Sequence, residues 1–326
     1  MGKVKSIVEI EIMSEQFIQA VRSGDFSAAC EQILNLTEKQ IDESLFLLAY
    51  DDSNFCSYAF VEFLLATQEK EFFLRLAFVI ADCGINYLEG AYAVAAHHAR
   101  VMYELVQPRD PTDDGGLLFL FDYPWGAVSV EEAVSVASKI LEHDPANQAA
   151  LLALKNASER KEDPTSPIRN EREQLEQHIL AGKFTQAKQL INIVSDRELH
   201  AMLIYLGCEE RHLCAYAFTW YLMQEKEVAE LHYLAYRIVT QAYARNLTGC
   251  DATGIFHLRR AMALEPENEK YVEHFLMLHT PPLGPTPLIS DDEAEMFAKQ
   301  FLDRNRFNIV ATNTLKKMGR YDAKYD

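Results

Sequence analysis

The residues best suited to proton transfer are two adjacent histidines, His97 and His98, with Arg100 close behind them. A third histidine, His257, lies at a comparable place in the second half of the chain. Imidazole changes its charge near neutral pH, which makes it a common general acid or base. Neighbouring residues of a helix point to different sides, so His97 and His98 cannot both face one substrate. We therefore expect these histidines to serve the structure.

Two pairs of adjacent carboxylates are the second candidates for chemistry. Asp51 and Asp52 recur as Glu209 and Glu210, in each case shortly before a Cys-x-Tyr-Ala-Phe segment. Paired carboxylates can bind a cation or divide acid and base roles between them. We expect both pairs at the start of a helix, where the macrodipole favours negative charge whatever the function.

Motifs of higher specificity are missing from the sequence. It contains no GxxxxGK[ST] or GxGxxG loop, no HExxH or GxSxG motif, no EF-hand loop and no cysteines at zinc spacing. The six cysteines are scattered among apolar residues, which is typical of reduced core residues. No catalytic residue, cofactor or metal site is predicted.

The chain repeats itself at a fixed offset. Residues 14–65 align without a gap with residues 172–223, and 14 of the 52 positions are identical. The identical residues include Cys56, Tyr58, Ala59 and Phe60, which recur as Cys214, Tyr216, Ala217 and Phe218. Self-similarity at a fixed offset is typical of stacked repeat architectures. We interpret the sequence as one domain written twice.

Helical periodicity runs through both copies, and no segment after residue 13 alternates as a strand does. Capping boxes predict helix starts at Thr37 and Ser129, and they recur at Ser195 and Ser290. The predicted class is all-α. We place a leader or extended segment at residues 1–13, the first copy at 14–157, a charged, proline-bearing linker at 158–170, the second copy at 171–318 and a tail at 319–326.

The pattern G-x-F-x-x-A occurs at Gly24–Ala29 and again at Gly182–Ala187. The glycine can end one helix in the left-handed conformation, the aromatic fills the gap where the chain doubles back, and the alanine admits the second helix. This pattern resembles the turn between the two helices of a tetratricopeptide repeat. Asp144–Asn147 and Glu265–Asn268 resemble the turn that closes that repeat. The resemblance implies two tandem domains of stacked helical hairpins, side by side or as a continuous α-α superhelix.

The net charge of −18 is concentrated in the first copy. Residues 1–160 hold 25 acids and 11 bases, whereas residues 161–326 hold 24 acids and 20 bases. Such a field disfavours nucleic acid and anionic membranes and favours a basic partner. The longest apolar run, residues 72–81, is too short to span a membrane, and no signal-peptide pattern opens the chain. We expect a cytoplasmic protein.

Six residues are candidate contacts for a partner: Asp51, Asp52, Asp113, Asp114, Trp125 and Trp220. The four aspartates contribute to the acidic field. Trp220 aligns with Glu62, and a tryptophan specific to one copy is a candidate for an exposed anchor. The leading hypothesis is a non-catalytic helical-repeat protein that binds a basic protein or peptide. One alternative is an acidic inhibitor, such as a bacterial immunity protein that neutralises a toxin. Another is an all-helical enzyme with a cleft between the copies.

Overall fold

The computed structural model describes residues 7–68, 71–107, 109–122, 127–160, 170–243, 247–279, 288–322 and 325. Within these ranges every regular element is helical, and extended backbone pairs only in an isolated bridge between Asn54 and Thr248. The all-α prediction is confirmed. The structure is consistent with a helical repeat.

The N-terminal half, residues 7–160, contains α1 (Ile7–Arg22), α2 (Phe26–Ile33), α3 (Glu38–Tyr50), α4 (Phe55–Thr67), α5 (Glu71–Val79), the π-helical η1 (Ile80–Gly84), α6 (Ala91–Val106), α7 (Leu117–Asp122), α8 (Val130–His143) and α9 (Gln148–Glu159).

The C-terminal half, residues 170–325, contains α10 (Glu171–Leu180), α11 (Phe184–Leu190), the 3₁₀ turn η2 (Ile191–Ile193), α12 (Asp196–Ile204), the π-helical η3 (Tyr205–Glu209), α13 (Leu213–Glu225), α14 (Ala229–Ile238), the π-helical η4 (Val239–Tyr243), α15 (Cys250–Leu264), α16 (Glu269–Met277), α17 (Asp291–Arg304) and α18 (Ile309–Lys317).

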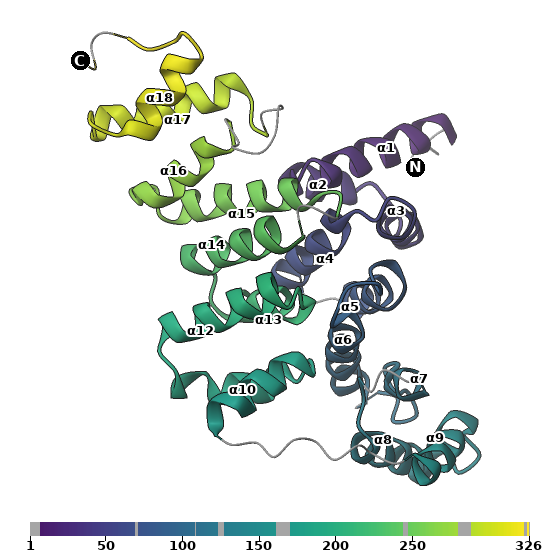
Figure 1. Ribbon diagram of the computed structural model, residues 1–326. Helices are drawn as coiled ribbons and strands as arrows, with labels where there is room; N and C mark the ends of the chain where they lie inside the picture. Colours follow the sequence, from purple (N-terminus) through teal and green to yellow (C-terminus); the bar gives the residue numbers. More distant parts are fainter. Residues whose placement is uncertain are drawn as a thin grey trace.

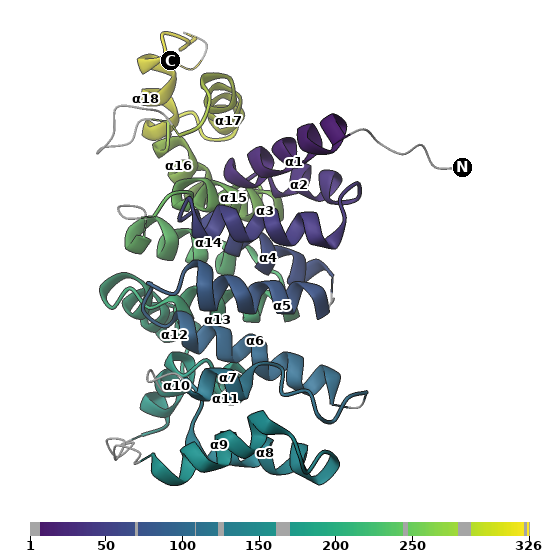
Figure 2. The ribbon, with the colours of Figure 1, turned by 90° about the vertical axis from the view of Figure 1, so that its right-hand side faces the viewer.

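The helices form two antiparallel columns that lie side by side. In Figure 1 the first column descends from α1 to α9 and the second ascends from α10 to α18. Figure 2 shows the same arrangement from the side, with the hairpins α8–α9 and α17–α18 at opposite ends of the molecule. The two columns meet where α4 packs against α13.

Local signals in the sequence account for several helix ends. Gly24 and Gly182 adopt positive φ angles of 71° and 64° and so end α1 and α10, as their motif predicts. The predicted capping boxes at Thr37 and Ser195 are complete. Ser129 and Ser290 also cap their helices, but the expected reciprocal bond is not made at either site. The glutamate three residues on pairs instead with an arginine, Glu132 with Arg100 and Glu293 with Arg259.

The predicted segment at residues 1–13 needs a correction, because α1 already begins at Ile7. The β-branched residues there suggested an extended chain. Phe17 and Val21 are four residues apart on this helix, however, and both are buried, as helical spacing requires. Residues 161–169 of the expected linker lie outside the described residues. The domain boundaries stay predictions.

The two halves exchange equivalent contacts across the central pair of helices. The Phe55 amide donates to the carbonyl of Thr248 at 2.9 Å, and the aligned Leu213 amide donates to the carbonyl of Glu89 at 2.8 Å. The ring of Phe26 lies 4.4 Å from that of Phe256, and the aligned Phe184 lies 4.3 Å from the ring of His97. Each helix-turn motif of one half therefore packs on the other half.

One continuous apolar core results from this exchange. It includes buried residues of both halves, from Phe17 in α1 to Phe256 in α15. Buried residues of α14 to α18 form a second, smaller core. The halves share their main core, so we expect them to unfold together.

The glycines at the exchanged contacts provide a test of this packing. A Cβ atom at Gly24 would collide with the backbone carbonyl of Ala252, and one at Gly182 with that of Ala93. We expect Gly24→Ala and Gly182→Ala each to lower the free energy of unfolding by about 3 kcal/mol, through the left-handed φ and the collision together. Urea unfolding followed by circular dichroism measures this.

Gly319 supplies the matched control, since it has a φ of 69° and no atom within 4 Å of a built Cβ. Gly319→Ala should cost only about 1 kcal/mol, from the backbone conformation alone. Equal losses at Gly24 and Gly319 would contradict the described contact between the halves.

Candidate functional site

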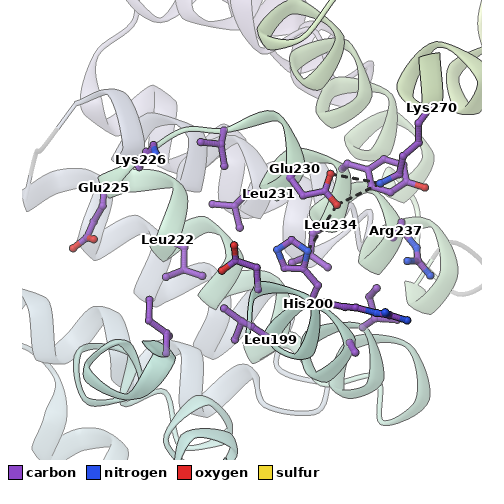
Figure 3. A pocket seen from close by; sticks show the side chains of 17 residues that line it. Leu199, His200, Leu222, Glu225, Lys226, Glu230, Leu231, Leu234, Arg237 and Lys270 are labelled. Carbon is purple, nitrogen blue, oxygen red and sulfur yellow. Dashed lines mark hydrogen bonds and ion pairs between the residues drawn. The ribbon is translucent and has the colours of Figure 1, made fainter. Parts of the chain in front are cut away.

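A groove on the C-terminal half has a volume of about 810 Å³. Its walls are α12, the end of α13 and α14. The capping box of Ser195 fixes the start of α12, and a short turn after Glu225 brings α14 back across the groove. The apolar lining residues are Ile191, Leu199, Ala201, Ile204, Leu222, Val228, Leu231 and Leu234. Figure 3 shows several of these side chains together with the charged residues around them.

Glu230 organises one end of the groove. Its carboxylate accepts hydrogen bonds from Lys270 Nζ at 3.3 Å and from the Tyr271 hydroxyl at 2.8 Å. His200 Nδ1 lies 3.8 Å from the same carboxylate. Burial lowers the pKa of His200, and the charge of Glu230 opposes this shift. The Lys270 ammonium also lies 3.8 Å from the centre of the Tyr233 ring, so a cation–π contact covers the aromatic wall.

The groove carries positive charge that its acids do not neutralise. Glu230 pairs with Lys270, and Glu225 pairs with Lys188. Arg197, Lys226 and Arg237 line the groove and have no ion-pair partner within the described part of the chain. Asp196 is the one lining acid without such a pair there, and it lies in the first turn of α12, where the macrodipole favours it.

The N-terminal half does not repeat this charge pattern. The positions that align with Arg197 and Lys226 hold Lys39 and Gln68. When the starts of the π-helical η1 and η4 are matched, the residue of α5 that corresponds to Arg237 is Phe78. The positions of His200 and Ala201 are held by Asp42 and Glu43. The cationic groove is therefore a property of the C-terminal half.

A second group of polar residues lies inside the core. In the N-terminal half the Tyr58 hydroxyl donates to the buried carboxylate of Glu62. His98 Nε2 lies 3.2 Å from that carboxylate and 3.4 Å from the Tyr58 oxygen. The Tyr58 ring approaches that of Tyr216 from the other half, with 6.4 Å between their centres. This cluster therefore lies at the contact between the halves.

The corresponding cluster of the C-terminal half is a longer chain of hydrogen bonds. Tyr216 bonds to His257 Nε2 at 3.0 Å, and His257 Nδ1 bonds to His232 Nδ1 at 2.9 Å. His232 Nε2 then bonds to Glu227 at 2.9 Å, and Arg260 holds the Glu227 carboxylate through two bonds. One of the two facing Nδ1 atoms must accept, so the two rings cannot both be protonated.

The pKa values of this chain follow from burial and from its ion pair. Burial lowers the pKa of His232 to about 4, and Glu227 opposes this shift. Burial also lowers the pKa of His257 and of His97, in both cases well below the usual range. The bonds from Arg260 lower the pKa of Glu227 to about 2. These histidines are therefore neutral at pH 7 and buried among aromatic rings.

The predicted role of the histidine pair fits this geometry. His97 and His98 point to different elements, His97 to Phe184 of α11 and His98 to Tyr58 of α4. Both rings are buried, and the side chain of His257 is 0% exposed. His97 nevertheless lines a cavity of about 510 Å³ together with Arg100 and Glu132, whereas His98 and His257 line none of the described cavities.

The first predicted acidic pair is exposed, but its position needs a correction. Asp51 caps the C-terminal end of α3, and the start of α4 is capped by Asn54, which accepts from the Cys56 amide at 2.9 Å. Ser53, with a φ of 48°, turns the chain between these helices and moves the helix start beyond the aspartates. Asp52 pairs with Arg22, and both aspartates line a cavity of about 370 Å³.

The other predicted contact residues differ in where the structure places them. Asp113 and Asp114 are half-buried and accept bonds from the amides of Gly115 and Gly116 at 2.8 and 3.0 Å, so they hold the turn before α7. Trp125 lies outside the described residues. The groove was not predicted, because one of its lining residues, Lys270, comes from α16, far along the chain from α12.

Trp220 is not an exposed anchor, and that prediction was wrong. Its side chain is only 2% exposed, and its ring lies 5.2 Å from that of His257. A signal in the sequence does point to this burial. Residues 213–220 are apolar or small on every side of the helix, which is typical of a helix packed all round.

Comparison of the chain with protein-family models, with curated proteins and with solved structures found no match. Along the part of the chain that the structure describes, no helix has the length and apolar character needed to cross a bilayer.

The buried histidines make stability depend on pH. An unfolded histidine takes up a proton near pH 6.5, whereas His232 does so only near pH 4 in the fold. The unfolded state therefore gains protons first, and the free energy of unfolding falls as the pH drops below 6.5. We expect a loss of about 1 kcal/mol per buried histidine between about pH 6.5 and 5.5. Urea unfolding at a series of pH values measures the slope.

His232→Gln removes one of the titrating groups. The free energy of unfolding should then fall by about 1 kcal/mol less between about pH 6.5 and 5.5 than it does in the wild type. His143→Asn, at an exposed position, is the control and should leave the slope unchanged. A slope that His232→Gln does not alter would contradict the neutral, buried state of this ring.

Proposed function

We propose that the protein is a non-catalytic binding protein that holds segments of partner proteins on its helical surface. The observation that carries this proposal is the open, mainly apolar groove between α12 and α14, bordered by charged side chains. Surfaces of this kind bind ligands by apolar burial and use the polar rim for orientation. The groups suited to catalysis lie in the core instead.

We further propose that the chain arose by duplication of a tetratricopeptide-like unit. The contacts exchanged between aligned residues support this idea, since Phe26 and Phe184 occupy equivalent places against opposite halves. The turns at Gly24 and Gly182 support it as well, because both use the same backbone conformation.

The acidic N-terminal half is proposed to engage a basic partner. Four acids at or near α3 are exposed, namely Glu38, Asp42, Glu43 and Asp51. Glu43 and Asp51 line the same small cavity as Asp52. Negative charge on one face increases the rate of encounter with a basic surface.

A catalytic role is the less favoured proposal. It requires His97 or His257 to meet a substrate beside an acidic pair. Both rings are buried, and Asp51 and Asp52 lie on the surface. His97 lines a cavity with Arg100 and Glu132, but Asp51 and Asp52 line a separate one.

The first test of the proposed function changes the groove. Leu231 is a half-buried residue of its apolar wall, so Leu231→Asp introduces a charge where a partner's apolar side chains would pack. We expect this variant to lose at least about ten-fold in affinity for a protein that the wild-type chain captures from its own cells.

Leu152→Asp, at an exposed position on α9, is the control and should bind as the wild type does. Circular dichroism must show that both variants are folded. Retention of every captured protein by the folded Leu231→Asp variant would refute the groove as the binding site.

The second test concerns the acidic face. The double variant Asp51→Asn and Asp52→Asn removes two exposed charges. It should weaken binding of a basic partner several-fold at low ionic strength and little at high salt, because salt screens exposed charges. Binding whose affinity ignores both the substitutions and the salt concentration would exclude the electrostatic part of the proposal.

A further inference from the structure

Three cations without ion-pair partners surround the apolar groove of a strongly acidic protein. The chain holds 49 acids and 31 bases, so most bases have acids to pair with. Nearby Lys188, Lys270 and Arg260 are paired, with Glu225, Glu230 and Glu227 respectively. Arg197, Lys226 and Arg237 have no such pair within the described part of the chain. The uncompensated charge at the groove is therefore positive.

The positions of these cations define the size of the complementary ligand. Lys226 precedes α14 and Arg237 lies in its last turn, so they are separated by about the length of this helix, roughly 15 Å. Figure 3 shows Lys226 and Arg237 on opposite sides of Leu231 and Leu234. A ligand that reaches both cations must cross the apolar wall between them.

The walls favour a helical ligand. No sheet edge exists among the described residues, so a peptide cannot bind by adding a strand. The groove is lined mainly by leucine and isoleucine, and Lys270 covers its one aromatic side chain, Tyr233. Polyproline ligands require exposed aromatic walls. A helix can instead pack its ridge of side chains between α12 and α14.

We propose that this groove binds an acidic amphipathic helix of a partner protein. The apolar face of that helix packs on Leu222, Leu231 and Leu234, and its carboxylates meet Arg197, Lys226 and Arg237. This inference rests on the proposed binding function and adds the chemical class of the partner. It also separates the two halves, because the N-terminal half lacks two of the three cations and holds Asp42 and Glu43 at the positions of His200 and Ala201.

Synthetic peptides test the proposal on the full chain. The probe is a fluorescent peptide of about five helical turns, with leucines on one face and glutamates on the other. Two matched peptides keep the leucines and replace the glutamates by glutamine or by lysine. Fluorescence anisotropy gives the affinities. We expect the glutamate peptide to bind at least about ten-fold more tightly than the lysine peptide at low salt.

Variants locate the binding. Arg197→Glu, Lys226→Glu and Arg237→Glu should each weaken binding of the glutamate peptide about three-fold, and the triple variant at least about ten-fold. Arg306→Glu, at an exposed position between α17 and α18, is the matched control and should change nothing. Leu231→Asp should weaken all peptides that bind in the groove.

The outcomes separate this inference from the proposed function. Equal affinities for the three peptides, with a loss only in Leu231→Asp, would overturn the acidic preference and leave the groove as a binding site. A preference for glutamate that survives the triple variant would place the peptide elsewhere and also overturn the inference. Failure of all three peptides to bind the folded chain would contradict both proposals.

Discussion

The structure depends on the packing of each half against the other at α4 and α13. Each half completes the burial of the other's turn motif, because Phe26 packs on Phe256 and Phe184 packs on His97. The absence of a side chain at Gly24 and at Gly182 lets the backbones of the two halves approach closely. Apolar burial drives this packing, and the backbone bonds at Phe55 and Leu213 fix its register.

This packing determines what the ionisable residues can do. Tyr58, Glu62 and His98 lie where the halves meet, and Tyr216 connects the same region to His257. A buried polar group is costly unless it is paired, so these residues must satisfy one another. Burial lowers the pKa of His97, His232 and His257 and so keeps these three rings neutral at pH 7. The histidines that looked most suited to chemistry therefore lie within the packed interior.

The sequence predicted the features that depend on neighbouring residues. The glycine turns at Gly24 and Gly182 and the caps at Thr37 and Ser195 formed as expected, since each involves only a few consecutive residues. Features that depend on distant residues were not predicted. The Glu132 carboxylate pairs with Arg100, which is 32 residues away, and does not complete the capping box at Ser129. The groove needs Lys270 of α16 to neutralise Glu230 of α14, and no pattern in the sequence indicates that pair.

The two predictions that failed at the site have local explanations. Trp220 is buried because α13 is packed on every side, which outweighs any advantage of exposing a tryptophan. Asp51 and Asp52 lie at the end of α3 because Ser53 turns the chain before α4 begins. The aspartates are exposed nonetheless, so the acidic face can be tested as proposed.

The central claim is that His97, His232 and His257 are neutral, buried parts of the core. Ring resonances of the full-length chain, recorded by NMR from about pH 8 to 5, test it most directly. His97, His232 and His257 should keep the shifts of neutral rings throughout this range for as long as the protein stays folded. A reversible titration of any of these rings near pH 6.5 in the folded protein would contradict the claim.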